Sequence, residues 1–185
     1  RCALDQPNQQ SASKGYEADG LLYLKSGSKE QNILAKQGDD LRIDWGYFYM
    51  VAGKENTAYS VGNSTELRKN FVNGTLNSAS LEGEDSNGNM ALVRSHGKVK
   101  NVTDKIMLGY DDIYSIQYFG TNLRPYWNSK GDRTIEAEML AAYNEYDKLL
   151  ARCYAFDKKL MEDASAAGGK EYAELCALAY RQSIA

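Results

Sequence analysis

Two short stretches of the chain combine side chains that could bind a charged substrate. In the first, Arg42 and Asp44 stand two residues apart, so they project from the same face of a strand. They could form a structural ion pair in a sheet, or they could face a ligand in a groove. In the second, Tyr180, Arg181 and Gln182 interrupt an apolar stripe. The guanidinium of Arg181 suits a carboxylate ligand, and a solvated or interhelical ion pair is the alternative.

No complete set of catalytic residues is visible beside these five candidates. The single histidine, His96, lies in a strand-like segment without a recognisable nucleophile beside it. The adjacent Asp111 and Asp112 could bind a cation, although turn chemistry explains them as well. Phosphate-binding loops, nucleophile elbows and the common zinc and calcium motifs are missing from the sequence. We therefore expect no catalytic residue within this chain, no metal site and no cofactor.

The three cysteines do not form a disulfide framework. Cys153 and Cys176 fall on the predicted core faces of two helices, offset by on the order of 12 Å along the helix axes, too far for a disulfide. We expect both to be buried free thiols. Asn-x-Thr sequons begin at Asn63, Asn73 and Asn101, a pattern that also occurs by chance.

Composition excludes several classes of partner. The net charge is −3, and the sequence has no basic footprint, which argues against a nucleic-acid partner. Its longest apolar runs fall well short of the roughly 18 residues of a membrane span. Tyrosine is frequent, with 14 residues, which fits half-buried sheet surfaces or surfaces that bind polyols.

The first part of the chain reads as short strands. The clearest is predicted over 41–51, where large side chains occupy every odd position; Phe48 and Met50 make its second half apolar on both faces, so we expect the later helices to cover it. Residues 1–20 are polar and are predicted to form a loop. Further strands are expected near 21–24, 32–36, 58–61, 90–98, 105–109 and 114–118, and a short helix over 64–72 with Ser64 as N-cap.

The last part of the chain is helical. Apolar residues recur at steps of three and four from Met139 to Leu160, which predicts a long helix with one apolar face and with Asp132 as its N-cap. Gly168 and Gly169 should end this helix, and a second one begins at Lys170, giving an αα-hairpin.

Strands followed by helices indicate the α+β class, with an antiparallel β-sandwich-like domain before the helical hairpin. We predict a β-domain over 1–120, a linker over 121–133 and the hairpin over 134–185. Because the second helix runs to the last residue without a cap, we also expect the chain to be part of a longer protein.

Three strings resemble signatures of the glutaminase A family. They are DLRIDWGYFY (40–49), YDDIYSIQYF (110–119), and GGKEYAEL (168–175) with LAYRQ (178–182). In that family a β-sandwich-like domain precedes a toroid of six helical hairpins that resembles those of glycosidases. The resemblance implies that the hairpin is the start of an α/α toroid.

The resemblance further implies a secreted or periplasmic amidohydrolase that converts L-glutamine to L-glutamate and ammonia. The partners would be the rest of the helical domain and a small amide substrate. Two alternatives remain open, a fragment of a glycosidase-like enzyme that binds carbohydrate and a glycan-binding sandwich without catalytic activity.

Overall fold

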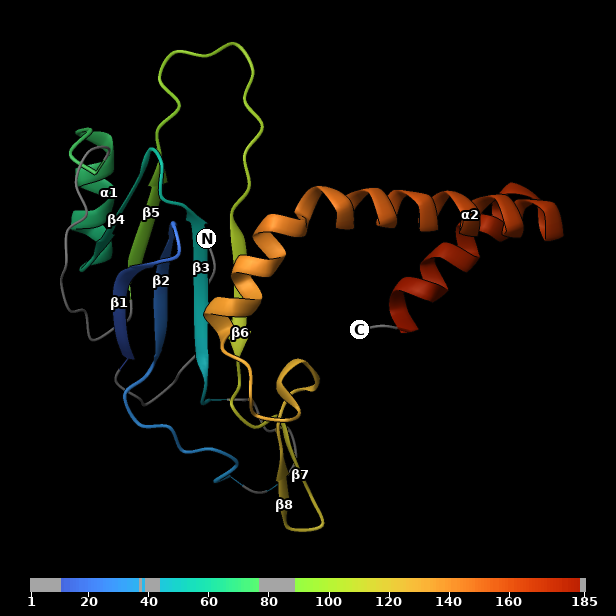
Figure 1. The fold of residues 1–185 in the computed structure, drawn as a ribbon, viewed down its shortest axis with the longest axis horizontal. Coiled ribbons are helices and arrows are strands. Elements are labelled where there is room, and N and C mark those ends of the chain that lie inside the picture. The colour runs from blue at the N-terminus through green and yellow to red at the C-terminus, as the bar shows by residue number, and fades with distance from the viewer. Residues whose placement is uncertain (1–10, 37, 39–43, 77–88, 184–185) are drawn as a thin grey trace. The chain divides into compact units, whose positions relative to one another are not determined.

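The computed structural model describes residues 11–36, 38, 44–76 and 89–183. The chain divides into two compact units, which we call the β-unit (Arg1–Leu140) and the helical unit (Ala141–Ala185). Within the described residues, an antiparallel four-stranded sheet, two two-stranded sheets and a short helix precede one long helical segment, which confirms the predicted α+β class (Figure 1). The predicted domain limits at 120 and 133 remain predictions.

The main sheet has the strand order β1-β2-β3-β6, with every neighbouring pair antiparallel. The strands are β1 (Ser11–Ala18), β2 (Leu21–Ser28), β3 (Tyr47–Gly53) and β6 (Met107–Asp111). Register places Gly15, Leu24, Met50 and Leu108 side by side on one face of the sheet. Lys14, Lys25, Tyr49 and Gly109 lie side by side on the other face.

A two-stranded antiparallel sheet, the β4–β5 layer, covers the first of these faces. Its strands are β4 (Thr57–Val61) and β5 (Met90–Arg94). Tyr59 and Val61 pack there with Leu22 and Leu24 in a buried apolar cluster. Gly15 on β1 permits this contact, because a Cβ at that position would overlap the ring of Tyr59.

The first turns of α2 (Ile135–Ser183) cover part of the opposite face. Met139 is only 7% exposed, and a Cβ at Gly109 of β6 would lie 2.9 Å from its Cε atom. The side chain of Thr134 accepts a hydrogen bond from the backbone N–H of Ala137 at 3.2 Å, so Thr134 caps this helix. The predicted cap, Asp132, is therefore wrong.

The remaining elements of the β-unit are short. They are α1 (Ser64–Val72), β7 (Ile116–Tyr118), β8 (Thr121–Leu123) and the 3₁₀ helix η1 (Tyr126–Asn128). Asn63, and not Ser64 as predicted, caps α1, because its side-chain oxygen accepts the Thr65 N–H at 2.9 Å.

The helical unit is a hairpin with its turn at the predicted glycines. Gly169 has φ 79° and ψ −175°, which interrupts the helical backbone of α2. The rings of Phe156 and Tyr180, on opposite sides of this turn, lie 5.0 Å apart between centroids. The helices on either side of Gly169 therefore pack against each other. Cys153 and Cys176 are free as predicted, but neither is buried, because Cys153 is exposed and Cys176 is half-buried.

Four further sequence predictions were wrong in detail. Residues 11–18 form β1 instead of a loop, since an edge strand pairs through backbone groups and needs no apolar run. Residues 32–36 form a turn and no strand. The strand predicted over 41–51 begins only at Tyr47 in the described residues, because Gly46 has φ +87°. The face with Met50 packs against β4–β5, and the first turns of α2 cover part of the opposite face, so the later helices cover only one side of this strand.

We predict that Gly15→Ala destabilises the β-unit by about 1–3 kcal/mol, because the added methyl group would displace the ring of Tyr59. Urea denaturation measures the change. The double variant Gly15→Ala/Tyr59→Leu is the control, and its loss should be smaller than the sum of the two single losses. Additive losses would contradict the proposed contact.

Candidate functional site

The two segments that carry the first two resembling strings meet in space. The indole N–H of Trp45 donates to the backbone oxygens of Asp112, at 2.7 Å, and Tyr114, at 3.0 Å. In return, the hydroxyl of Tyr110 donates to the backbone oxygen of Trp45. We call these residues, together with Gly46 and Asp111, the motif junction. It joins the residues just before β3 to the end of β6 and the loop that follows.

Gly46 allows the close approach at the motif junction. A Cβ there would lie 2.5 Å from the backbone oxygen of Asp111, and the φ of +87° also favours glycine. The Gln31 side chain holds the same point, because its oxygen accepts the Gly46 N–H at 2.6 Å and its nitrogen donates to the Ser28 oxygen at 2.9 Å. The backbone just before β3 is thus fixed by the end of β6 on one side and by Gln31 on the other.

Asp44 lies next to the motif junction and is 4% exposed. Its carboxylate forms an ion pair with Lys36, and its backbone oxygen accepts a hydrogen bond from the Ser28 hydroxyl at 2.8 Å. Asp44 therefore has a structural partner that the sequence did not indicate. Arg42 lies outside the described residues, so the Arg42–Asp44 pair stays a prediction.

A cluster of tyrosines lies on the sheet face that α2 partly covers. We call Tyr16, Tyr23, Lys25, Tyr49 and Glu136 the tyrosine face. The rings of Tyr16 and Tyr23 are stacked with centroids 5.1 Å apart. The Tyr16 hydroxyl donates to the Glu136 carboxylate at 2.6 Å, and the Tyr23 hydroxyl donates to the Glu136 backbone oxygen at 3.3 Å. These bonds tie the first turn of α2 to β1 and β2.

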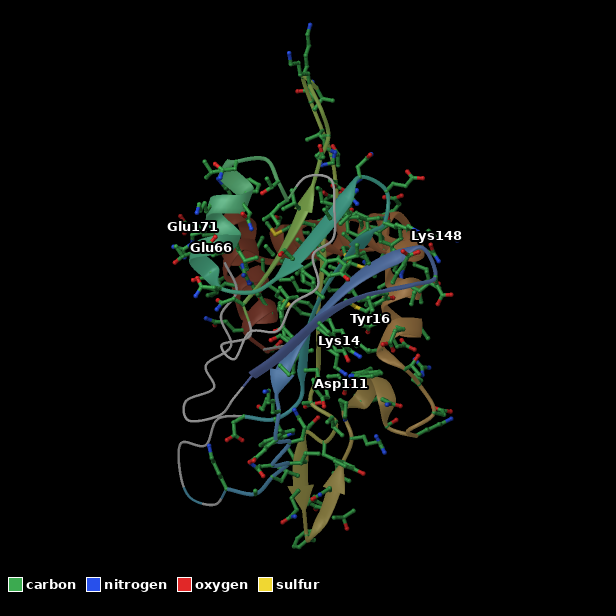
Figure 2. All side chains as sticks on the ribbon, turned by 90° about the vertical axis from the view of Figure 1, so that its left-hand side faces the viewer. Lys14, Tyr16, Glu66, Asp111, Lys148 and Glu171 are labelled. Carbon is green, nitrogen blue, oxygen red and sulfur yellow. The ribbon has the colours of Figure 1, made fainter. Side chains whose placement is uncertain are left out.

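Two positively charged residues are cross-strand neighbours at this face. Lys14 and Lys25 are paired in the register of β1 and β2, and the Lys14 ammonium lies 5.3 Å from the centroid of the Tyr16 ring (Figure 2). The Lys25 ammonium lies 3.6 Å from the centroid of the Tyr47 ring, within the range of a cation–π interaction. Burial lowers the pKa of Lys25, and the charge of Lys14 lowers it further.

Burial also raises the pKa of the tyrosines in this region. For Tyr16 the desolvation by burial is the largest cause, followed by the hydrogen bond to Glu136 and its charge. Burial is again the first cause for Tyr23 and Tyr49, and the charge of Glu136 is the second. At neutral pH these hydroxyls keep their protons. They can donate hydrogen bonds, but they are poor general bases.

His96 belongs to a polar cluster at the end of β5. Its Nε2 atom lies 3.0 Å from the Asp104 carboxylate, which also accepts two hydrogen bonds from the Arg94 guanidinium at 2.5 and 2.9 Å. The hydrogen bond from Arg94 lowers the pKa of Asp104. Arg94 also donates to the backbone oxygen of Gly53 at 2.5 Å. The cluster fastens the turn between β3 and β4, a structural role for the single histidine.

The candidates in the helical unit are exposed near the end of α2. Tyr180 is 45% exposed and packs on Phe156, and Arg181 and Gln182 are also exposed. Their side chains are open to a partner or ligand, and their role in substrate binding stays a prediction. They lie in a different unit from Asp44 and the motif junction.

The described residues contain no group of three or more His, Cys, Asp or Glu side chains that could hold a metal ion. A helix that is both long and apolar enough to cross a membrane is likewise missing from this part of the chain. Trp45 is buried and donates its N–H to backbone oxygens of the chain, so it cannot stack on a ligand.

Sequence reasoning did not identify the tyrosine face. Residues 1–20, which include Tyr16, were predicted to form a loop, and Glu136 was not among the candidate residues. The alternation of Lys14, Tyr16 and Ala18 is a period-two signal that could have indicated β1. The contact between Tyr16 and Glu136 spans 120 residues, and only the tertiary structure shows it.

Comparison with known proteins gives one match. Residues 2–163 match the model of a family described as a domain of unknown function (DUF5127). No curated protein and no solved structure matches the chain.

We predict that Trp45→Phe destabilises the β-unit by about 2–3 kcal/mol, because it removes the donor to two backbone oxygens that lie in partly buried surroundings. Thermal or urea denaturation measures the loss. Trp127→Phe is the matched control, since Trp127 is half-buried and the described residues form no hydrogen bond with its N–H. Equal losses for both variants would refute a special role for Trp45.

The raised tyrosine pKa values predict a loss of stability at alkaline pH. Unfolded tyrosine releases its proton near pH 10, whereas folded Tyr16 and Tyr49 hold theirs, so the unfolded state binds fewer protons above that pH. The free energy of unfolding should therefore stay level up to about pH 10 and fall beyond it.

Urea denaturation between pH 8 and pH 11 tests this dependence. The fall should be shallower in Tyr16→Phe than in the unchanged chain, because that variant lacks one of the protons held by the folded state. Tyr126→Phe is the control, since Tyr126 is 96% exposed and its surroundings change little on unfolding. The same alkaline fall in Tyr16→Phe and the unchanged chain would show that Tyr16 does not contribute.

Proposed function

Since this chain belongs to the DUF5127 family, we propose that it forms the β-sandwich-like scaffold and first helical hairpin of a glutaminase-like amidohydrolase. The reaction would be the hydrolysis of the side-chain amide of L-glutamine, which gives L-glutamate and ammonia. The protein would act outside the cytoplasm, as a secreted or periplasmic enzyme. Further helical hairpins of the toroid would supply the catalytic residues.

The motif junction carries this proposal. The strings 40–49 and 110–119 resemble one family in the same order along the chain, and their described parts are joined by the bonds of Trp45 and Tyr110. β3 and β6 add to this contact, since Tyr47 pairs with Asp111 in the sheet register. If the two strings resembled the family only by chance, there would be no reason for them to contact each other in the folded chain.

The hydrogen bonds of the junction and the tyrosine face favour a scaffolding role over a catalytic one. Trp45 and Tyr110 satisfy internal backbone groups, and Tyr16 and Tyr23 bind the first turn of α2. These groups are occupied within the β-unit and are not available to a substrate. The first turn of α2 is thereby held against β1 and β2 within the β-unit.

In the helical unit, Arg181 is the side chain best suited to a substrate. It is exposed, and its planar guanidinium can bind the α-carboxylate of glutamine through two parallel hydrogen bonds. Tyr180 and Gln182 flank it and can add further hydrogen bonds. Arg181 would be a binding residue and would not take part in proton transfer.

A glycosidase-like parent is the second candidate. It is favoured by the association of this family with β-sandwich domains that stand N-terminal in glycosidase-like proteins. Such an enzyme would use two carboxylates across a toroid cavity, one as acid and one as base or nucleophile. A glycan-binding sandwich is the weaker alternative, because Trp45 is buried.

Ammonia release from L-glutamine tests the proposal. We expect activity from the full-length protein that contains this chain and none from the chain alone, because the toroid supplies the catalytic groups. A coupled ammonia assay measures both, with heat-treated protein as the blank. Turnover by the chain alone would contradict the scaffolding role, and an inactive full-length protein that cleaves glycosides would favour the second candidate.

The role of Arg181 has its own test in the full-length protein. Arg181→Gln should raise KM for glutamine about 10-fold or more with a smaller change in kcat, because it removes a charged partner of the substrate carboxylate. Arg152→Gln is the matched control, since Arg152 is exposed on the same helical segment. Equal kinetics for both variants would exclude Arg181 from the binding site.

A further inference from the structure

Three Asn-x-Thr sequons remain unexplained by the proposed function. They begin at Asn63, Asn73 and Asn101, and each has threonine in its third position. The chain has thirteen asparagines and only six threonines, and three of these six threonines complete a sequon. Random placement would give fewer than one such pair on average. The helical unit contains no sequon, although it makes up the last 45 residues.

All three asparagines are exposed on the folded β-unit. Asn63 caps α1 through its side-chain oxygen, which accepts the Thr65 N–H at 2.9 Å, so its amide nitrogen is not needed for the cap. Among the described residues, no hydrogen bond involves the amide nitrogen of any of the three. A sugar on that nitrogen would therefore break no internal hydrogen bond.

The local backbone also places these side chains at the surface. Asn73 stands at the C-terminal cap of α1 and is followed by Gly74, whose φ of 75° turns the chain away from the helix. Asn101 lies in the exposed connection between β5 and β6, with exposed residues on either side. A glycan needs such open positions, because it is bulky and strongly hydrated.

Two of the sequons lie on the side of the sheet opposite the first turns of α2. Asn63 and Asn73 mark the two ends of α1, which contacts β5 of the β4–β5 layer (Figure 1). That layer covers the face of Leu24 and Met50, whereas Glu136 and Met139 of α2 contact the opposite face. Glycans at these positions would leave the tyrosine face free.

We propose that Asn63, Asn73 and Asn101 are acceptors of N-linked glycans, and that the glycans at Asn63 and Asn73 keep the α1 and β4–β5 side of the β-unit open to solvent. This inference rests on the extracellular location in the proposed function. The co-reactant is a lipid-diphosphate-linked oligosaccharide. The side-chain amide nitrogen forms a bond to the anomeric carbon, the bond from that carbon to the diphosphate oxygen breaks, the lipid diphosphate leaves, and the nitrogen loses one proton. No group is oxidised or reduced.

Secretion from a eukaryotic host tests the proposal. The 185-residue chain, placed behind a cleavable leader, is treated with a peptide amidase that converts each glycosylated asparagine to aspartate, and peptide mass spectrometry then reads each site. We expect all three sites to be modified. Thr65→Ala, Thr75→Ala and Thr103→Ala should each remove one glycan and leave the other two.

Matched serine variants separate loss of the sequon from loss of folding. Thr103→Ser keeps the hydroxyl of the sequon and should keep the glycan that Thr103→Ala loses, and the same holds for Thr65→Ser and Thr75→Ser. An unmodified site in the secreted, folded chain would overturn the proposal for that asparagine. Site occupancy is read without any substrate, so its result is independent of whether the full-length protein releases ammonia.

Discussion

The β-unit depends on a central strand that has no side facing solvent. In β2, Leu22 and Leu24 pack against the β4–β5 layer, whereas Tyr23, on the opposite face, is fully buried and reaches the first turn of α2. A strand buried on both faces needs two separate covers. The β4–β5 layer supplies an apolar cover, and the first turns of α2 supply a partly polar one through Glu136. Both covers come from segments that follow β2 in the chain.

The polar contacts of Glu136 position the first turn of α2 on the sheet. Hydrogen bonds from Tyr16 and Tyr23 to Glu136 are directional, so they set the position of the first turn of α2 more narrowly than apolar contact alone. Met139 adds close packing against Gly109. The motif junction lies at the end of the same sheet and fixes the loop after β6 through Trp45. At the first turn of α2 and at the loop after β6, the described side chains fix the backbone by hydrogen bonds. This is the property expected of a scaffold.

Several parts of the fold were accessible to sequence reasoning because they depend on local signals. The period of the apolar residues after Met139 predicted the long helix, and paired glycines predicted its interruption at Gly169. The candidate site was less accessible. Trp45 was interpreted as a member of an alternating strand, but the left-handed backbone of Gly46 separates it from β3, which begins at Tyr47. The alternation of side chains cannot reveal a glycine whose backbone turns the chain.

The sequence by itself determined the α+β class, the helical hairpin and the threonine sequons, since each follows from the types and spacing of residues close together in the chain. It also contained the strings whose order suggests a glutaminase-like parent. The tertiary structure alone decided that residues 11–18 form an edge strand, that Asp44 pairs with Lys36, and that Tyr16 binds Glu136. These facts depend on partners distant in the chain or on backbone pairing between strands. The spacing of nearby residues does not predict such contacts, because burial and hydrogen-bond partners depend on how the layers pack in the folded chain.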